Sequence, residues 1–414
     1  MSADQSFRDT DSVSTRRRFL RVAGATGLAG ALGVAGWTGR VLYLTGRNER
    51  ASLGTVDPDR SRVSGPSAAD VPAERLLSEL REYSGERSDV GLQACVVLED
   101  GTRWRGVAGV ADHDDDVPLS HAHHLYVGSV TKLYTATLVL DLVERGDLSL
   151  SDTLDEWVDL EYADDVTVAT LLNHTSGVPN YTSDAWFVAR YFGLPTRTWE
   201  PSDLLEVIRG SSLRFDPGVR HEYSNSNYVL LGIVSEEVTG RSYRSLLGHL
   251  VREGAGFDRT YYLDYPEDAR IANGYDESIF SVGRRNLTAF RTSLETGAYA
   301  AGGVLSTAPD IAGFVRALFT GEILTEATLS RMRTFVDAPD EDVTTQRGYG
   351  LGVRNLVIDG RSLVGHTGTI PGYSAIAMRH DDPEYTIAVL SNLSTIDQAG
   401  VFARLQDVVL DEFY

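Results

Sequence analysis

A serine and a lysine stand three residues apart in the stretch GSVTKLY, at positions 129 and 132. On a helix this spacing places two side chains on one face, so Ser129 and Lys132 are predicted to touch. A serine hydroxyl attacks carbonyl groups poorly unless a neighbouring base takes its proton. A lysine amine is such a base once burial or the positive end of a helix lowers its pKa. The pair predicts nucleophilic acyl transfer.

Lys132 is also the only lysine in the chain, because the other 37 of its 38 basic residues are arginine. An arginine could not replace a proton acceptor, since its guanidinium group stays protonated. A catalytic amine would explain why one lysine is kept. By itself, however, a Ser-x-x-Lys spacing is a weak signal.

Two further motifs follow in chain order, EYSNSNY and GHTGTIPGY. With them the chain resembles the superfamily of serine β-lactamases and D-Ala-D-Ala carboxypeptidases. The match is to the branch of class C enzymes, His-Thr-Gly carboxypeptidases and related esterases. The resemblance spans roughly residues 71–410 and includes LLNHTSGVP, AGGVLSTAPD and GYGLGV. The motif residues it adds to the pair are Tyr223, Asn225, His366, Thr367, Gly368 and Thr369.

The resemblance implies a role for each motif residue. Ser129 would be the nucleophile, and Lys132 its proton acceptor, alone or together with Tyr223. Tyr223 would relay the proton to the leaving group and later activate water. Asn225 would hold the substrate carbonyl or orient Lys132.

The third motif would bind the substrate. The backbone N–H of Thr369, beside that of Ser129, would form an oxyanion hole, with Gly368 in the same strand. His366 and Thr367 would line the pocket. Related β-lactamases usually carry lysine where this chain has His366, and a histidine offers positive charge only when protonated. We therefore expect weak β-lactamase activity and a small-molecule ester, amide or peptide substrate.

Two alternatives to this hydrolase remain open. One is a noncatalytic, penicillin-binding-like sensor that keeps the fold. The other is a carboxypeptidase of the D-Ala-D-Ala type or a β-lactamase.

We expect neither a metal nor a cofactor. The stretches HAHH (121–124) and DHDDD (112–116) contain residue types that bind metal ions. Adjacent residues in a flexible, solvated loop, however, lack a defined ligand geometry. His174 is expected to fix a loop by hydrogen bonding rather than to act in catalysis.

Helical spacing predicts a helix over residues 71–86, followed by two strands within 90–112 that meet at an Asp-Gly turn. A buried helix is expected over 129–144. The middle reads as mainly helical, and AYAAGGVLSTAPDIAGFVRALF reads as a further helix. Four strand-like runs and a last helix close the chain.

The predicted class is α+β, with an antiparallel sheet built from the N- and C-terminal parts and an inserted helical region. In domain terms, residues 71–414 form the hydrolase domain, with an α/β lobe over 71–150 and 300–414 and the helical region over 151–299.

The N-terminus reads as an export signal. Arginines 16–18, then Phe19 and Leu20, precede a Gly/Ala-rich apolar run, which resembles a twin-arginine signal. Residues 1–45 are therefore expected to be a signal or an anchor, and 46–70 a linker. The protein would act outside the cytoplasm, free or anchored on the outer face of the membrane, with no membrane contact except through this segment.

The chain carries a formal net charge of −21, and residues beyond the first fifty hold 30 basic against 55 acidic residues. This charge argues against nucleic acid as a partner. Acidic excess with arginine in place of lysine resembles the proteins of extreme halophiles, in which concentrated salt screens self-repulsion. An ordinary acidic protein with an arginine bias is the alternative.

Overall fold

The computed structural model describes residues 70–278, 283–339, 343 and 345–414. The predicted signal (1–45) lies outside the described residues, as does the predicted linker (46–70) except for its last residue. The description begins at helix α3 (Asp70–Glu86), one residue from the predicted start of the first helix.

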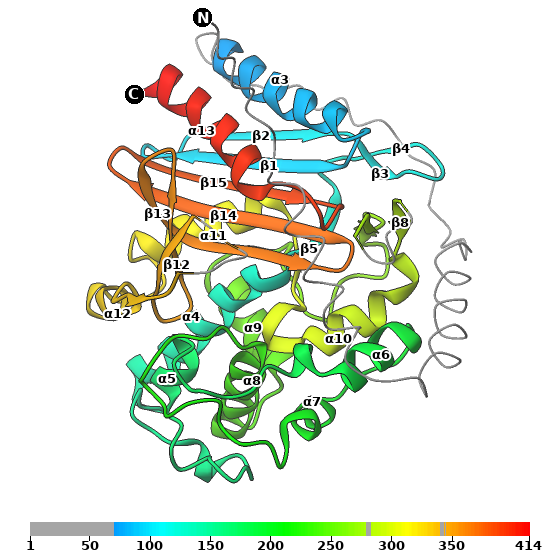
Figure 1. Cartoon of the computed structure of the whole chain (residues 1–414). Coiled ribbons are helices and arrows are strands. Elements are labelled where there is room, and N and C mark those ends of the chain that lie inside the picture. The colour runs from blue at the N-terminus through cyan, green and yellow to red at the C-terminus, as the bar shows by residue number, and fades with distance from the viewer. Residues whose placement is uncertain (1–69, 279–282, 340–342, 344) are drawn as a thin grey trace, which may run out of the picture. The chain divides into compact units, whose positions relative to one another are not determined.

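The centre of the fold is an eight-stranded antiparallel sheet (Figure 1). Its strand order is β10-β11-β12-β13-β14-β15-β1-β2, so the last strands of the chain pair with the first. This confirms the predicted fold class. The strands are β1 (Leu92–Leu98), β2 (Arg103–Ala108), β10 (Val336–Asp337), β11 (Gln346–Tyr349), β12 (Arg354–Ile358), β13 (Arg361–Ile370), β14 (Tyr373–Asp381) and β15 (Glu384–Ser391).

Helices cover both faces of this sheet. On one face lie α3 and the C-terminal helix α13 (Gln398–Phe413), which are drawn in blue and red in Figure 1. The core between them and the sheet includes Leu80 and Phe402, both fully buried. Helix α11 (Ala308–Phe319) contacts β1, β14 and β15. Burial of these apolar faces drives the two ends of the chain together.

The inserted region is mainly helical, as predicted. Its longest helix is α8 (Asn225–Thr239). Helix α10 (Arg291–Gly302), at the end of this region, packs against α8 and against α4 (Thr131–Arg145), which precedes the insertion. The remaining helices are α5 (Val168–Leu172), α6 (Ala185–Gly193), α7 (Pro201–Ile208), α9 (Tyr243–Gly248) and α12 (Glu326–Met332); single turns are η1 (Gly128–Val130), η2 (Leu154–Glu156), η3 (Tyr181–Ser183), η4 (His249–Gly254) and η6 (Thr288–Phe290).

Short strands connect the helical region to the sheet. They form small pairings outside the main sheet, of which β6-β5-β9 is the largest. These strands are β3 (Val110–Asp112), β4 (Val117–Pro118), β5 (His123–Tyr126), β6 (Arg270–Ile271), β7 (Tyr275–Asp276), β8 (Arg285–Asn286) and β9 (Leu305–Ser306).

Three details differ from the sequence-based expectation. HAHH is not a solvated loop, because His123 and His124 are buried in β5. The stretch predicted as one helix before Phe319 contains the end of α10, strand β9 and helix α11, which Thr307 caps. The run GYGLGVRNLVI holds parts of two strands, β11 and β12, instead of one.

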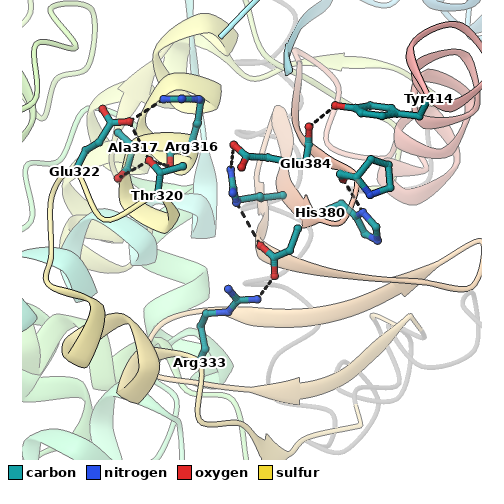
Figure 2. Close-up of polar contacts among 11 residues, drawn as sticks. Arg316, Ala317, Thr320, Glu322, Arg333, His380, Glu384 and Tyr414 are labelled. Carbon is teal, nitrogen blue, oxygen red and sulfur yellow. Dashed lines mark hydrogen bonds and ion pairs between the residues drawn. The ribbon is translucent and has the colours of Figure 1, made fainter. Parts of the chain in front are cut away.

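Arginine forms many ion pairs at the surface, some of which are drawn in Figure 2. Arg333, just after α12, reaches Asp381 at the turn between β14 and β15. Arg379 of β14 is almost fully buried and contacts Asp381 at 3.4 Å and Glu384 at 2.7 Å. Lys132 takes no part in any ion pair between described residues, so its single amine is kept for something other than surface charge.

Across the described part of the chain, no helix is long and apolar enough to cross a membrane.

Candidate active site

Ser129 lies in the 3₁₀ turn η1, between strand β5 and helix α4, and not in the helix itself. The turn is fixed from two directions. Val127 donates its backbone N–H to the carbonyl of Val304 at 3.0 Å, and Val304 donates its own to the hydroxyl of Thr131 at 3.1 Å. Ser129 itself stays partly exposed, so a substrate can reach its hydroxyl.

Lys132 follows in the first turn of α4, and its side chain is fully buried. Its Nζ atom lies 3.0 Å from Ser129 Oγ, 2.8 Å from Asn225 Oδ1 and 2.7 Å from the carbonyl oxygen of Ala301. Burial lowers the pKa of this amine, against a smaller opposing effect of Tyr223.

The three contacts of Lys132 define how a neutral amine would be oriented. The carbonyl oxygens of Asn225 and Ala301 can only accept hydrogen bonds, so both N–H groups of a neutral amine are directed at them. The lone pair then faces Ser129, whose hydroxyl can donate. The geometry is that of a general base acting on the nucleophile.

The Ala301 carbonyl is presented by an interrupted helix. Within α10, Tyr299 has φ 45° and ψ −134°, a strained conformation for a residue with a side chain. Beyond this point the carbonyl groups of Ala300 and Ala301 accept hydrogen bonds from Thr135 and Lys132 of α4. The end of α10 thus serves as an acceptor for the catalytic helix.

Tyr223 completes the proton-transfer set. The centre of its ring lies 4.9 Å from Lys132 Nζ and 5.0 Å from the guanidinium carbon of Arg354, a residue of β12. Burial raises the pKa of the Tyr223 hydroxyl, but the positive charges of Lys132 and Arg354 outweigh it, so the pKa is lowered. Tyr223 is thereby suited to exchange a proton with a neighbouring group.

Asn225 is the first residue of α8, and both the oxygen and the nitrogen of its side-chain amide form hydrogen bonds. Its Oδ1 accepts from Lys132, while its Nδ2 donates to Thr182 Oγ1 at 3.1 Å. Its backbone N–H donates to Asn180 Oδ1 at 3.1 Å. Asn225 thus contacts Lys132, as orienting it would require; its role stays a prediction.

The end of β13 packs directly against the nucleophile turn. A Cβ atom at Gly368 would lie 2.0 Å from the carbonyl oxygen of Val127 and 2.8 Å from the backbone N of Ser129. A Cβ at Gly128, where φ is +53°, would lie 2.8 Å from the backbone N of Thr369. Glycine at both positions lets β13 lie against the turn, so the backbone nitrogens of Ser129 and Thr369 are both at this contact. That their N–H groups form an oxyanion hole stays a prediction.

His366 and Thr367 lie behind this gap. The His366 ring is fully buried, and its Nε2 is 2.8 Å from the hydroxyl of Tyr349. Burial holds the pKa of His366 well below its usual range, with Arg354 and Lys132 adding to the effect. His366 is therefore neutral near pH 7. Thr367 is buried and shares a strand face with Thr369; contact of either residue with substrate stays a prediction.

The structure also identifies site residues that sequence reasoning missed. Arg354 and Tyr349 form, with His174 and His366, a buried cluster around the Tyr223 ring. Arg354 follows directly after the quoted GYGLGV run, which was the one available signal. The contact itself depends on the pairing of Arg354 with Gly365 across β12 and β13, which the sequence does not display.

The histidine and aspartate motifs have structural roles. His174 Nδ1 accepts the backbone N–H of Ser224 at 3.3 Å, which confirms the expected loop-fixing role next to Tyr223. In HAHH, His123 Nδ1 accepts from the backbone N–H of Ser120 at 3.0 Å, and His124 Nδ1 lies 3.3 Å from the Arg270 carbonyl. No cluster of three or more His, Cys, Asp or Glu side chains in the described ranges is arranged to hold a metal ion.

The family model described as Beta-lactamase matches residues 75–409. The chain belongs to the β-lactamase family. That match covers the sheet, the helical insertion and every motif residue described above, so the predicted resemblance is confirmed.

Individual relatives give the same result. Penicillin-binding protein 4* of Bacillus subtilis is 27% identical over 295 residues. The match covers 69% of this chain and 64% of that protein, so this chain spans slightly less than two thirds of the length of the penicillin-binding protein. Esterase EstB of Burkholderia gladioli is 27% identical over 348 residues, 76% of this chain and 87% of the esterase. The D-amino acid amidase of Ochrobactrum anthropi has the same fold, with a TM-score of 0.73 at 24% identity over 83% of this chain and 99% of the amidase.

The close approach at Gly368 predicts the effect of one methyl group. A Gly368→Ala variant should lower kcat by about 10²–10³-fold, because the new Cβ pushes β13 away from η1 and opens the oxyanion hole. Ester hydrolysis and thermal unfolding would be measured together. Gly85→Ala, at a position with open space around the glycine, is the matched control. Full activity of Gly368→Ala would show that β13 does not form the hole.

Arg354 predicts a shift in pH dependence. Its charge lowers the pKa of both Lys132 and Tyr223, so Arg354→Met should raise both values. The acid limb of kcat/KM then moves to higher pH, and activity lost at neutral pH returns under more alkaline conditions. Arg354→Lys keeps the charge and should shift the limb less. Arg361→Met, at the far end of β13, is a control, and an unchanged limb in Arg354→Met would contradict the assignment.

Proposed function

We propose that this protein hydrolyses ester bonds, or amide and peptide bonds, of small molecules through an acyl-enzyme on Ser129. One observation carries the proposal: the buried amine of Lys132 has two obligate acceptors and the nucleophilic hydroxyl as its neighbours. This arrangement is of little use for stability, because burying an amine costs free energy. It is what activation of a serine requires.

Acylation would use the groups in sequence. The proton of Ser129 passes to Lys132 as Oγ bonds to the substrate carbonyl carbon, and the backbone N–H groups of Ser129 and Thr369 stabilise the oxyanion. When the intermediate collapses, the bond to the alcohol or amine breaks. The leaving group takes up the proton of the Tyr223 hydroxyl, which leaves Tyr223 as a phenolate beside the protonated Lys132.

Deacylation would run through the same residues. Water gives a proton to Tyr223 as its oxygen adds to the acyl carbonyl carbon. The bond to Ser129 Oγ then breaks, the hydroxyl regains a proton from Lys132, and a carboxylic acid leaves. No metal or cofactor is needed for either half of this reaction.

The character of the site favours uncharged substrates. His366 is buried and neutral, so it does not present a permanent positive charge to a substrate carboxylate as a lysine at this position would. The esterase relative, matched over 87% of its length, supports an ester substrate. A carboxypeptidase or β-lactamase is the second candidate, which the match to a penicillin-binding protein supports.

The proposal predicts a covalent adduct. Incubation of the protein with a p-nitrophenyl ester in molar salt should release p-nitrophenol and add the mass of one acyl group. Ser129→Ala should abolish both, and Lys132→Ala should reduce acylation by several orders of magnitude.

Three outcomes, obtained with this ester and with a fluorescent penicillin as a second reagent, separate the candidate functions. Stable labelling by a fluorescent penicillin would favour the carboxypeptidase, whereas turnover of the penicillin would favour a β-lactamase. Full activity of Lys132→Ala would refute its role as base. A folded wild-type protein that forms no adduct with either reagent would point to the noncatalytic sensor.

Export is part of the proposed function and rests on the N-terminal sequence, in which Arg16 and Arg17 precede Phe19 and Leu20. The hydrolase would act outside the cytoplasm, free or held by an uncleaved N-terminal segment. In a host with a twin-arginine pathway, replacing Arg16 and Arg17 by lysine should leave the protein in the cytoplasm. Fractionation and immunoblotting would show this, and normal export of the variant would reject the assignment.

Adaptation to high salt is also proposed, supported by the net charge of −21 and the near absence of lysine. Removing salt restores repulsion between the acidic groups, so the protein should unfold when dialysed from molar to millimolar salt. Circular dichroism would follow the loss. A protein that stays folded in millimolar salt is an ordinary acidic protein.

A further inference from the structure

The first residue of helix α13, Gln398, reaches the end of strand β13 beside the nucleophile. Its Nε2 lies 2.7 Å from the carbonyl oxygen of Gly368 and 3.0 Å from Thr369 Oγ1. These are the two residues that form the strand side of the oxyanion hole. The side-chain amide therefore touches the site from a part of the chain that none of the three motifs includes.

The Gly368 contact fixes the orientation of the Gln398 amide. A backbone carbonyl can only accept a hydrogen bond, so the NH₂ group must face it. The second hydrogen of the same NH₂ group is donated to the hydroxyl oxygen of Thr369. The hydroxyl oxygen of Thr369 is consequently an acceptor toward Gln398.

This orientation decides what the Thr369 hydroxyl offers to a substrate. Its hydrogen cannot be donated to Gln398, and Gln398 is its one hydrogen-bond partner among the described residues. Thr369 is exposed, and its backbone N–H lies at the oxyanion gap. The hydroxyl hydrogen is thus free to be donated beside the carbonyl group under attack.

Gln398 is itself held in place. The preceding residue, Asp397, caps α13 by accepting the backbone N–H of Gly400 at 2.9 Å. The backbone N–H of Asp397 donates to the hydroxyl of Tyr83 in α3 at 3.0 Å. The start of α13 is fixed by two elements that pack on the sheet, so the amide is supported by a rigid base.

We propose that Gln398 is a positioning residue: by donating to the Thr369 hydroxyl oxygen, it leaves the hydroxyl hydrogen directed at the substrate. The site would thereby select substrates with a hydrogen-bond acceptor next to the scissile carbonyl. An ether, ester or carbonyl oxygen at that place would receive the Thr369 hydroxyl hydrogen. A methylene group there would leave the hydroxyl without a partner. The inference rests on the proposed ester hydrolysis.

Two substrate pairs, each differing by one oxygen in place of one CH₂ group, test this selection. p-Nitrophenyl methoxyacetate and butyrate differ in the acyl part, and 2-methoxyethyl and butyl acetate differ in the alcohol part. Comparing the kcat/KM ratio of a pair between enzyme variants cancels the intrinsic reactivity of the esters. The wild type should prefer the ether member of at least one pair.

The decisive variant is Gln398→Glu, which keeps the size of the side chain but replaces a donor by an acceptor. The carboxylate would draw the Thr369 hydroxyl hydrogen toward itself, so the ether preference should fall by about tenfold, the range for one hydrogen bond. In a Thr369→Val background, Gln398→Glu should change the ratio no further. Asp407→Asn, on the same helix, is the control and should keep the wild-type ratio.

Should Gln398→Glu fail to fold in a thermal unfolding assay, Gln398→Met removes both hydrogen bonds without adding a charge. It should lower kcat more than it changes KM, because β13 loses its support. A wild-type ratio in a folded Gln398→Glu protein, or a wild-type kcat in a folded Gln398→Met protein, overturns the inference and leaves ester hydrolysis intact. An absence of turnover of all four esters by wild type would instead refute the proposed function on which the inference rests.

Discussion

The burial of one amine among fixed acceptors is the constraint on which the site depends. A buried lysine costs free energy unless its amine has polar partners, and the structure supplies these from three separate elements. Ser129 comes from η1, Asn225 from the start of α8 and the Ala301 carbonyl from the end of α10. The sheet, the helical insertion and their connections must therefore all be in place before this amine has its partners.

The same contacts divide the chemistry between two layers. The groups proposed to meet a substrate are the Ser129 hydroxyl, the N–H groups of the expected oxyanion hole and the exposed side of β13. Behind them, Arg354, Tyr349 and His174 contact the Tyr223 ring, and the charges of Lys132 and Arg354 lower the pKa of its hydroxyl. The positive charge is thus held inside the protein, where it acts on the proton-transfer residues, while His366 at the strand stays neutral.

The sequence carried the chemical core of the site but not its surroundings. The contact between Ser129 and Lys132 follows from a local spacing, and it survives although Ser129 lies in a 3₁₀ turn rather than in the helix. Tyr223 and Asn225 lie more than ninety residues away, so only the resemblance joined them to the pair. Arg354 and Gln398 act through strand register and helix packing, which no local pattern reveals.

The errors in the predicted elements have a similar origin. The polar side chains of His123 and His124 suggest a surface loop, yet both are buried because strand β5 pairs with residues near 270 and 305. Local propensity could not show that pairing. In AGGVLSTAPD, the pattern of small and apolar residues concealed a helix end, a two-residue strand and a new helix cap within ten positions. Short elements held by distant partners are the ones that sequence periodicity misses.

The presence of a single lysine among 414 residues has a practical consequence. Isotope-labelled lysine supplied during expression would enter the chain at one position, and that position is the proposed proton acceptor of the site. A magnetic resonance spectrum of the labelled protein would contain one lysine side-chain signal, with no assignment problem. The protonation of this amine could then be followed directly during acylation, which is rarely possible in a protein of this size.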